Sequence, residues 1–422
     1  MNFSSLDLAP DLQKAIDACG YKQMTPIQEK AIVSARRGHD LLANAQTGTG
    51  KTAAFALPIL QQMTDHPKPT LSGAPRALIL TPTRELAEQL AETISRYAQF
   101  LPVTVTALYG GVKMTGQQAK LKAGVDILVS TPGRLLEHLE QCNLNLASAE
   151  FVVLDEADRM LDMGFITDVT ELLKKTAKKR QTLLFSATAS TAVNSLAKDL
   201  LKNHEVIRVA KQNATADTVE HVVYPVEERR KIELFLDLIE QHNWFQVLVF
   251  TSTKAQADAL MRNLKMVRIS AALCHGDKSQ GSRRRALADF KAGDVQVLVA
   301  TEVAARGLDI QGLEHVVNFN LPYLVEDYVH RIGRTGRAGA KGQAISFVSR
   351  EEERSLDNIE RLIGAKIKRI FMRGYEVGSR TKLKSNLAQQ PRPARTNKAT
   401  ETKIIRDKKG SGTAKAATKK KR

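Results

Sequence analysis

The chain of 422 residues is long enough for two or three domains with large hydrophobic cores, which excludes a small disulfide-stapled protein. Its composition is 43% hydrophobic and 26% charged, and no apolar run approaches the roughly 18 residues of a membrane helix. We therefore expect a soluble protein that makes no membrane contact. The net charge of +18 favours a polyanionic partner such as nucleic acid.

Short apolar runs alternate with longer helix-patterned stretches along the chain. In the first half these runs are 40–43, 77–81, 126–130, 151–154 and 182–185. The pattern stops over the polar residues 211–218, and in the second half the runs are 246–250, 295–300, 315–319 and 344–348. Such alternation is typical of parallel α/β sheets. The sequence therefore predicts two α/β domains, and their similar rhythm permits two copies of one fold.

The C-terminal stretch differs in composition from the rest of the chain. Residues 376–422 contain 15 basic and 3 acidic residues, a net of +12 out of the total of +18, and no aromatic residue. Because such a segment cannot bury a core, we expect a disordered tail. It is either a tethered polycation that binds nucleic-acid phosphates or a tail that only keeps the protein soluble.

Two features favour a cytoplasmic location. Residues 1–10 contain neither a basic residue nor the apolar core of a secretory signal. The cysteines Cys19, Cys142 and Cys274 are more than a hundred residues apart, and no Cys-x-x-Cys or Cys/His cluster is present. We therefore expect reduced thiols.

A glycine-rich loop lies between the first predicted strand and a helix-like run. The loop reads Ala45-Gln46-Thr47-Gly48-Thr49-Gly50-Lys51-Thr52. This context is that of a phosphate-binding loop, although Ala45 stands where the general pattern has glycine. Gly48 and Gly50 let backbone N–H groups turn toward phosphate oxygens, Lys51 supplies positive charge, and the Thr52 hydroxyl can bind Mg²⁺.

An acidic motif follows the apolar run 151–154. It reads Asp155-Glu156-Ala157-Asp158. Asp155 is placed to hold Mg²⁺, partly through water, and Glu156 to orient and polarise an attacking water. The alternative is a helix N-cap without a catalytic role, but the glycine-rich loop upstream favours the nucleotide site.

The second half of the chain offers positive charge for the same reaction. The basic motif reads His330-Arg331-Ile332-Gly333-Arg334-Thr335-Gly336-Arg337. Arg334 and Arg337 have the character of arginine fingers that neutralise a γ-phosphate, and the alternative is a basic loop with glycine turns. If they come from the second domain, ATP binding closes the cleft between the domains and hydrolysis reopens it.

In this order the motifs resemble those of the DEAD-box ATP-dependent RNA helicases, in particular the bacterial RhlE-like branch. The acidic motif spells Asp-Glu-Ala-Asp, and Ser186-Ala187-Thr188 follows at the expected place. The resemblance covers about residues 1–370 and implies two tandem RecA-like domains. The implied limits are a Gln-motif region at 1–29, the ATP-binding domain at 30–208, a linker at 209–218, the C-terminal helicase domain at 219–374 and the basic tail at 375–422.

The resemblance also implies how ATP is bound. Tyr21 would stack on adenine, with Phe3 upstream, and the amide of Gln28 would pair with adenine N6 and N7. Asp309 would meet the ribose. The residues implied to couple hydrolysis to domain closure are Asp158, Ser186, Thr188 and His330.

The RNA contacts that the resemblance implies lie on loops rich in Gly, Thr and Arg. Such loops bind phosphates and ignore the base sequence. In the first domain these residues are Pro82, Thr83, Arg84, Gly111, Thr131, Pro132, Gly133 and Arg134. In the second domain they are His275, Gly276, Gln280, Arg283 and Thr301. Three positions depart from the family pattern, namely Met24, where Pro is common, and Glu302 and Asn320, where Asp is common.

The sequence thus predicts a monomeric, RNA-stimulated ATPase with ATP and Mg²⁺ as cofactors. The resemblance implies that hydrolysis drives local, non-processive unwinding of short RNA duplexes or remodelling of RNA–protein complexes, and that ribosomal precursors or mRNA decay complexes are compatible partners. Two other interpretations remain open. One is an RNA clamp that holds ATP without turnover, and the other is a DNA-acting helicase of the same superfamily.

Overall fold

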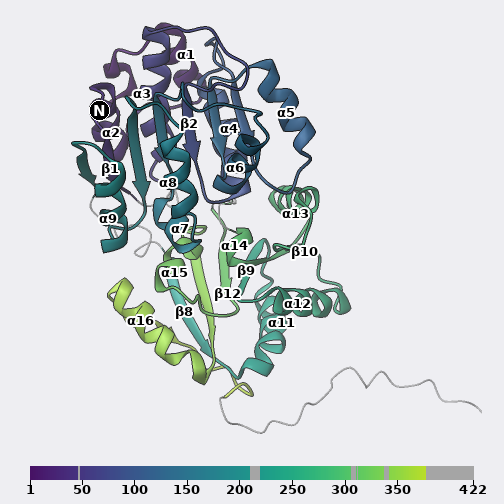
Figure 1. Ribbon diagram of the computed structural model, residues 1–422. Coiled ribbons are helices and arrows are strands. Elements are labelled where there is room, and N and C mark those ends of the chain that lie inside the picture. Colours follow the sequence, from purple (N-terminus) through teal and green to yellow (C-terminus); the bar gives the residue numbers. More distant parts are fainter. Residues whose placement is uncertain (46–47, 210–218, 306–309, 311, 337–341, 377–422) are drawn as a thin grey trace, which may run out of the picture. The chain divides into compact units, whose positions relative to one another are not determined.

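The computed structural model describes residues 1–45, 48–209, 219–305, 310, 312–336 and 342–376, all within one compact unit, Met1–Ser379 (Figure 1). No helix in these ranges is long and apolar enough to cross a membrane. The predicted linker at 209–218 and tail at 375–422 lie almost entirely outside the described residues.

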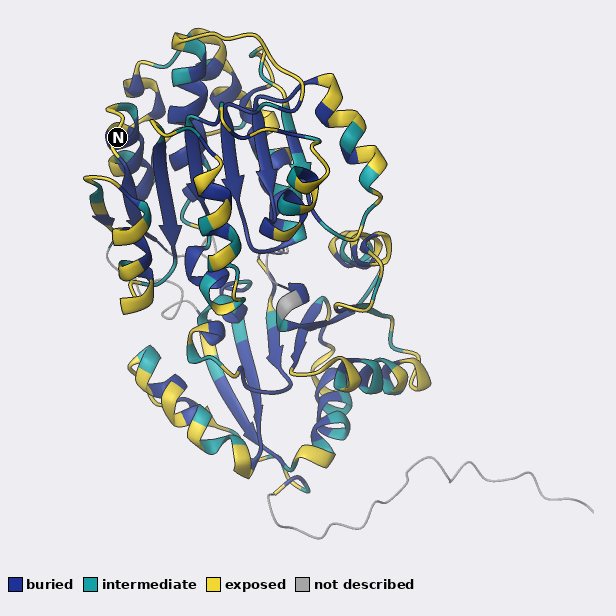
Figure 2. Ribbon diagram, in the orientation of Figure 1, coloured by how far each residue is buried: buried dark blue, intermediate teal, exposed yellow. Residues whose placement is uncertain are grey.

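The first half of the chain forms a sheet of seven parallel strands. The strands are β1 (Leu41–Asn44), β2 (Ala77–Leu80), β3 (Val105–Leu108), β4 (Ile127–Ser130), β5 (Phe151–Leu154), β6 (Gln181–Ser186) and β7 (Glu205–Arg208). Their spatial order is β3-β4-β2-β5-β6-β1-β7. All residues of the five inner strands are buried, because helices cover both faces of the sheet (Figure 2).

The helices of this half begin with a 3-10 turn at the N-terminus. They are η1 (Phe3–Leu6), α1 (Pro10–Ala18), α2 (Pro26–Arg36), α3 (Lys51–Asp65), α4 (Arg84–Tyr97), α5 (Met114–Ala123), α6 (Pro132–Glu140), α7 (Ala157–Asp162), α8 (Ile166–Lys174) and α9 (Thr191–Leu200). Successive strand residues enter different cores: Leu41 and Ala43 pack on one face of the sheet and Leu42 on the other.

The second half repeats this topology strand for strand. Its strands are β8 (Val219–Pro225), β9 (Val247–Thr251), β10 (Ala271–Cys274), β11 (Val297–Thr301), β12 (His315–Asn318), β13 (Gly342–Val348) and β14 (Lys368–Arg369). Their parallel order, β10-β11-β9-β12-β13-β8-β14, matches the first sheet when seven is subtracted from each number. The chain therefore contains two copies of one fold, as the rhythm of the sequence permits.

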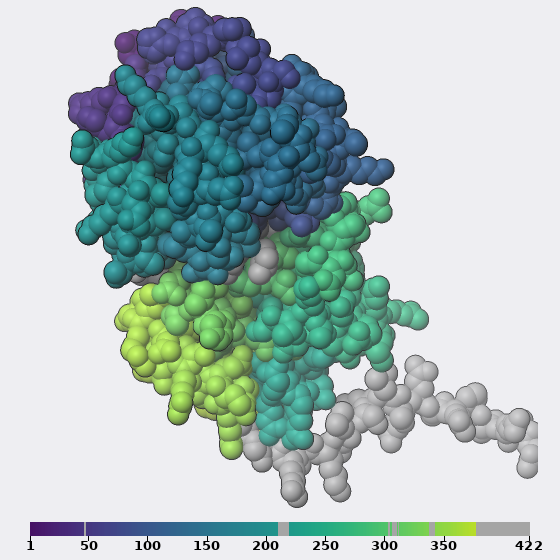
Figure 3. Space-filling view, in the orientation of Figure 1, coloured from purple at the N-terminus to yellow at the C-terminus, as the bar shows by residue number. Residues whose placement is uncertain are grey.

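The helices of the second half again flank the sheet. They are η2 (Glu228–Arg230), α11 (Lys231–His242), α12 (Lys254–Met266), α13 (Gln280–Ala292), α14 (Glu302–Ala305), α15 (Val325–Ile332), η3 (Arg350–Glu352) and α16 (Glu353–Ile363). On the face shown in a space-filling view, the atoms coloured purple to teal and those coloured green to yellow form separate groups (Figure 3).

The predicted fold class, two parallel α/β domains, is confirmed, and all nine predicted strands are present within two residues of their predicted ends. Five strands were not predicted, and four of them, β3, β7, β10 and β14, lie at sheet edges. Tyr375, which the sequence assigns to the tail, is 7% exposed and packs in the core of the second half.

The predicted site loops share one edge of the first sheet. The glycine-rich loop follows β1, the acidic motif follows β5, and Ser186 ends β6. Thr83 and Thr131 follow β2 and β4 in the same way. Because the strands are parallel, their carboxyl ends meet at a single edge, where ligands bind in open α/β sheets.

Candidate nucleotide and RNA site

The glycine-rich loop depends on backbone conformations that glycine adopts easily. Gly48 and Gly50 have φ angles of 79° and 88°. A Cβ atom on Gly50 would lie 2.2 Å from Nε2 of Gln28, so a side chain there would displace the Gln28 amide in addition to straining the backbone. Two loop residues, Gln46 and Thr47, lie outside the described residues.

Lys51 is a buried cation at the start of α3. Its side chain is 7% exposed, and Nζ lies 3.9 Å from Oδ1 of Asp155. Within the described residues, Nζ has no hydrogen-bond partner. A buried ammonium is normally hydrogen-bonded, so this position suits an additional anion such as a phosphate group.

Two carboxyl groups face this cation. The backbone N–H of Glu156 donates to Oδ1 of Asp155 at 3.0 Å. Burial raises the pKa of both carboxyl groups, and the Lys51 ammonium opposes the increase. The Arg334 guanidinium also lowers the pKa of Glu156, so the second half of the chain contributes charge to this site. Arg337 lies outside the described residues.

The donor set suits Mg²⁺. Thr52 and Asp155 offer hard oxygen atoms, and a cation would favour the ionised form of a carboxyl group whose pKa burial raises. Within the described residues, no group of three or more His, Cys, Asp or Glu side chains is arranged to hold a metal alone. Mg²⁺ usually binds one or two carboxylates together with substrate phosphates and water.

Asp158 connects the acidic motif to the end of β6. Its Oδ2 accepts hydrogen bonds from the backbone N–H groups of Ala187, at 3.1 Å, and Thr188, at 3.0 Å. The Ser186 hydroxyl donates to the carbonyl oxygen of Thr188 at 2.8 Å. The structure therefore brings together three of the four predicted coupling residues.

The fourth coupling residue, His330, lies on α15. Three residues before it, Asp327 forms an ion pair with Arg159 on α7, and each of these two side chains is 4% exposed. Arg159 directly follows Asp158. Removing one partner of a buried ion pair costs about 3–5 kcal/mol because it leaves the other charge buried and uncompensated, so each of these two side chains depends on the other being in place.

Tyr21 is the aromatic ring best placed to stack on a base. Its side chain is 37% exposed, its ring stacks on Phe3 at a centroid distance of 5.8 Å, and its hydroxyl lies 3.0 Å from that of Tyr97. Phe3 is only 2% exposed, so it supports the Tyr21 ring and is itself almost closed to a ligand.

Gln28 ties the adenine motif to the glycine-rich loop. Its Oε1 accepts from the Thr25 backbone N–H at 2.8 Å, and its Nε2 donates to the Gly50 carbonyl at 3.1 Å. The Thr25 hydroxyl donates to the Thr49 carbonyl at 2.7 Å. The Gln28 amide keeps one N–H and one lone pair, which is enough for a pair of bonds to adenine.

Two predicted RNA motifs of the first half meet at Arg84. Its guanidinium lies against the backbone of Gly110 and Gly111: a Cβ on Gly111 would be 2.0 Å from Nη1. Arg134 holds the same loop, since its Nε donates to the Tyr109 carbonyl at 3.1 Å and its Nη2 to the Val112 carbonyl at 2.6 Å.

The other predicted RNA residues of this half lie at helix N-termini. The Thr83 hydroxyl accepts from a backbone N–H in the first turn of α4 at 3.3 Å, and Pro82 is buried before it. Thr131 precedes α6, which begins with Pro132 and Gly133. Helix N-termini present unpaired N–H groups, which suit phosphates.

The side chains of the predicted RNA residues in the second half are buried or already bonded to other residues. Gln280 donates from Nε2 to Oε1 of Glu85 at 3.0 Å, and Nη2 of Arg283 lies 2.9 Å from the same oxygen. His275 is 1% exposed, with Nε2 3.4 Å from Asp258.

Gly276 follows His275, and Thr301 ends β11 with an exposure of 8%. Asp309, the predicted ribose contact, lies outside the described residues.

The three departures from the family pattern have ordinary partners. Glu302 forms an ion pair with Arg331. The Asn320 side chain accepts a backbone hydrogen bond at 3.3 Å and donates to Glu228 at 3.0 Å. Met24 is 7% exposed and packs in the hydrophobic core.

Comparison with known proteins agrees with this arrangement. Residues 25–196 match the DEAD/DEAH box helicase domain, and residues 230–339 match the helicase conserved C-terminal domain. The chain belongs to the DEAD-box helicase family. Curated DEAD-box relatives include ATP-dependent RNA helicase RhlB of Pseudomonas aeruginosa, 45% identical over 370 residues that cover 86% of this chain and 93% of the relative. Another is DEAD-box ATP-dependent RNA helicase CshA of Bacillus anthracis, 40% identical over 87% of this chain and 69% of the relative. The RhlE-like branch stays a prediction.

Solved DEAD-box structures show the same fold. Dbp5 of S. cerevisiae bound to RNA and ADP BeF3 is 32% identical, with a TM-score of 0.78 over 88% of this chain and 95% of that chain. Mss116p bound to single-stranded RNA and AMP-PNP is 27% identical, with a TM-score of 0.78 over 88% of this chain and 80% of that chain.

Sequence reasoning missed several residues at the contacts between the two halves. They are Glu88, Tyr109, Arg159, Arg284 and Asp327. The only signal for Arg284 was its place in the basic run 283–285, which looks like any solvated helix face.

Proposed function

We propose that this chain is an ATP-dependent RNA helicase. RNA stimulates its ATP hydrolysis, which drives local, non-processive unwinding of short RNA duplexes or remodelling of RNA–protein complexes. The observation that carries the proposal is the charge cluster of Lys51, Asp155 and Glu156, because Arg334 from the other half of the chain acts on Glu156. When a site is built from both halves of the chain, hydrolysis of the bound ATP can change how the two domains are positioned relative to each other.

The residues of the site divide the work of phosphoryl transfer. Backbone N–H groups of the glycine-rich loop and the Lys51 ammonium hold the phosphates, and Glu156 orients and polarises the attacking water. Mg²⁺, held by Thr52 and Asp155, would neutralise charge on the phosphate oxygens. Arg334, together with Arg337, stabilises the charge that develops on the transferred phosphoryl group.

Hydrolysis is coupled to closure through neighbouring contacts. Asp158 bonds the backbone at Thr188, and the next residue, Arg159, is paired with Asp327 on α15. A change at the acidic motif therefore reaches the second half through buried, charged contacts. We assign His330 to this network because it lies on the same helix.

RNA binding uses the phosphate backbone. Arg84, the loop at Gly111 and the N-termini of α4 and α6 offer a guanidinium and unpaired N–H groups, which read phosphates and ignore the bases. In the second half, the track continues over His275, Gly276 and Thr301 and over Gln280 and Arg283, which bond Glu85 of the first half. The partner is structured or duplex RNA, such as a ribosomal precursor or an mRNA decay complex.

We propose that the protein works as a monomer in the cytoplasm. Its three cysteines, Cys19, Cys142 and Cys274, are free thiols, which suits a reducing compartment.

The test is ATP hydrolysis with and without a mixed-sequence RNA. We expect RNA to stimulate turnover and Glu156→Gln to reduce the stimulated rate by about 100-fold or more, because the substitution removes the carboxylate charge and keeps the shape. The matched control is Glu171→Gln on α8, whose side chain is 56% exposed. It should keep the parental rate.

Two results would contradict the proposal. ATP binding without turnover would favour an RNA clamp, and equal stimulation by DNA of the same length would favour a DNA-acting helicase, since only RNA offers 2′-hydroxyl groups.

A further inference from the structure

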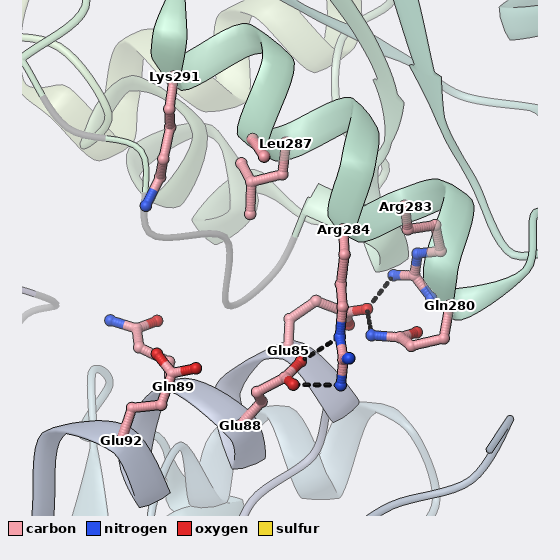
Figure 4. A pocket seen from close by; sticks show the side chains of 10 residues that line it. Glu85, Glu88, Gln89, Glu92, Gln280, Arg283, Arg284, Leu287 and Lys291 are labelled. Atoms are coloured by element: carbon pink, nitrogen blue, oxygen red, sulfur yellow. Dashed lines mark hydrogen bonds and ion pairs between the residues drawn. The ribbon is translucent and has the colours of Figure 1, made fainter. Parts of the chain in front are cut away.

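Helix α4 of the first half faces helix α13 of the second half across a pocket of about 390 Å³ (Figure 4). The α4 side is acidic and the α13 side is basic. The charged lining residues are Glu85, Glu88 and Glu92 on α4 and Arg283, Arg284 and Lys291 on α13. The two helices are therefore complementary in charge, and the ion pairs of Arg283 with Glu85 and of Arg284 with Glu88 lie close together (Figure 4).

Arg284 makes the contact that no helicase motif accounts for. Its Nε donates to Oε2 of Glu88 at 2.9 Å, and Nη2 forms an ion pair with Oε1 of the same carboxylate. Nη2 also donates to the Tyr109 hydroxyl, and that hydroxyl donates to Oε1 of Glu88 at 3.1 Å. The three side chains thus form a closed ring of hydrogen bonds across the two halves, which we call the Arg284 ring.

Tyr109 connects the Arg284 ring to the predicted RNA-binding loop at Gly110 and Gly111. Its carbonyl oxygen accepts from Arg134, at 3.1 Å, and from Gln117, at 3.0 Å, and the next two residues are Gly110 and Gly111. Tyr109 is 8% exposed, and burial raises its pKa to about 12, so the hydroxyl keeps its proton at neutral pH. The residue is therefore fixed at its backbone and bonded at its hydroxyl.

The Arg284 ring is suited to reversible contact. The side chain of Arg284 is 49% exposed and that of Glu88 is 25% exposed, whereas the neighbouring pair of Arg283 and Glu85 is 8% and 10% exposed. A partly exposed ion pair forms and breaks at low cost. When Arg284 leaves, Glu88 stands unneutralised beside a loop that binds phosphates, and its charge repels RNA.

We propose that Arg284, Glu88 and Tyr109 are positioning residues that couple closure of the two domains to RNA binding at Gly110–Gly111. In the closed arrangement, Arg284 neutralises Glu88 and fixes the Tyr109 side chain, so the RNA loop is ready to bind. The inference deepens the proposed function and depends on it. It concerns the affinity for RNA and leaves the chemical step unchanged.

The experiment measures ATP hydrolysis by the full chain as a function of the concentration of a mixed-sequence RNA. We expect Arg284→Gln to raise the RNA concentration for half-maximal rate about two- to fivefold, the range of one partly exposed ion pair, with the maximal rate unchanged. Tyr109→Phe, which removes only the hydroxyl, should raise it less. The matched control is Arg285→Gln, an exposed arginine on the same helix, which should match the parent.

The double variant separates coupling from a direct RNA contact. If Arg284 acts through Glu88, then Arg284→Gln has little further effect in a Glu88→Gln background, because the repelling charge is already gone. Equal effects in both backgrounds would mean that Arg284 binds RNA itself, and this would overturn the coupling. If Arg284→Gln, Glu88→Gln and Tyr109→Phe all behave like Arg285→Gln, the coupling role is wrong and the proposed function still stands. If RNA does not stimulate the parent protein, the proposed function is wrong as well.

Discussion

At the scale of single residues, burial decides the chemistry of the nucleotide site. Asp155 is buried beside Lys51 and Glu156 is partly buried next to it, so each carboxyl group responds strongly to the few charges near it. A methyl group on Gly50 would displace the Gln28 amide from the Gly50 carbonyl, so the loop and the adenine motif depend on each other.

The acid side of the pH profile should report Glu156. Burial raises its pKa, so hydrolysis, which requires the carboxylate, is present above that pKa and is lost as the pH falls through it. Arg334 lowers this pKa. We therefore expect Arg334→Gln to slow the reaction and to move the acid limb of its residual kcat/KM profile to higher pH.

The matching control is Arg285→Gln, whose profile should overlay that of the parent. An acid limb that stays in place or moves to lower pH in Arg334→Gln would show that Arg334 does not act on Glu156.

At the scale of elements, helix caps place the functional loops. Thr25 caps α2 in a capping box with Gln28, and its hydroxyl also reaches the glycine-rich loop at Thr49. In the second half, Thr253 caps α12 in the same way, with Gln256 as its partner. The two caps are alike locally, but only the first contacts the nucleotide loop.

This pair gives a controlled prediction. Thr25→Ala and Thr253→Ala should each lower the free energy of unfolding by about 1 kcal/mol, the usual value of an N-cap. Only Thr25→Ala should also weaken ATP binding, because it alone releases the Thr49 carbonyl. Thermal unfolding and ATP titration without RNA measure the two effects, and equal losses of ATP affinity would contradict the assignment.

Elements also show where the sequence is uninformative. The inner strand at 151–154 is apolar at every position because both faces of the sheet are covered, so its end points could be predicted. Edge strands are partly exposed and carry a weaker signal: β7 is mixed in composition, and β10 consists mostly of small residues. β8, which has Glu220 and His221 in its first half, was missed for the same reason.

At the scale of the whole molecule, two copies of one fold meet through charged contacts. The buried pair of Arg159 and Asp327 and the more exposed pair of Arg284 and Glu88 differ in accessibility. A molecule that opens and closes needs contacts of limited strength, and the Arg284 ring is of that kind.

The basic C-terminal stretch is expected to affect RNA binding by the whole molecule. It carries +12 of the net charge of +18, so removing residues 377–422 should raise the RNA concentration for half-maximal hydrolysis and flatten its dependence on salt. Truncation after Glu376 keeps Tyr375, whose hydroxyl donates to Asp237. An unchanged salt slope would leave only the solubilising role.

The sequence by itself determined the two α/β domains and the family, and it predicted a nucleotide site at the glycine-rich loop and the acidic motif, because these depend on local spacing and on runs of apolar residues. Only the tertiary structure decided which side chains meet across the halves. Arg284 and Glu88 are 196 residues apart, and the pairing of two charges at such a separation follows from the packing of α13 on α4. Local sequence carries no record of that packing.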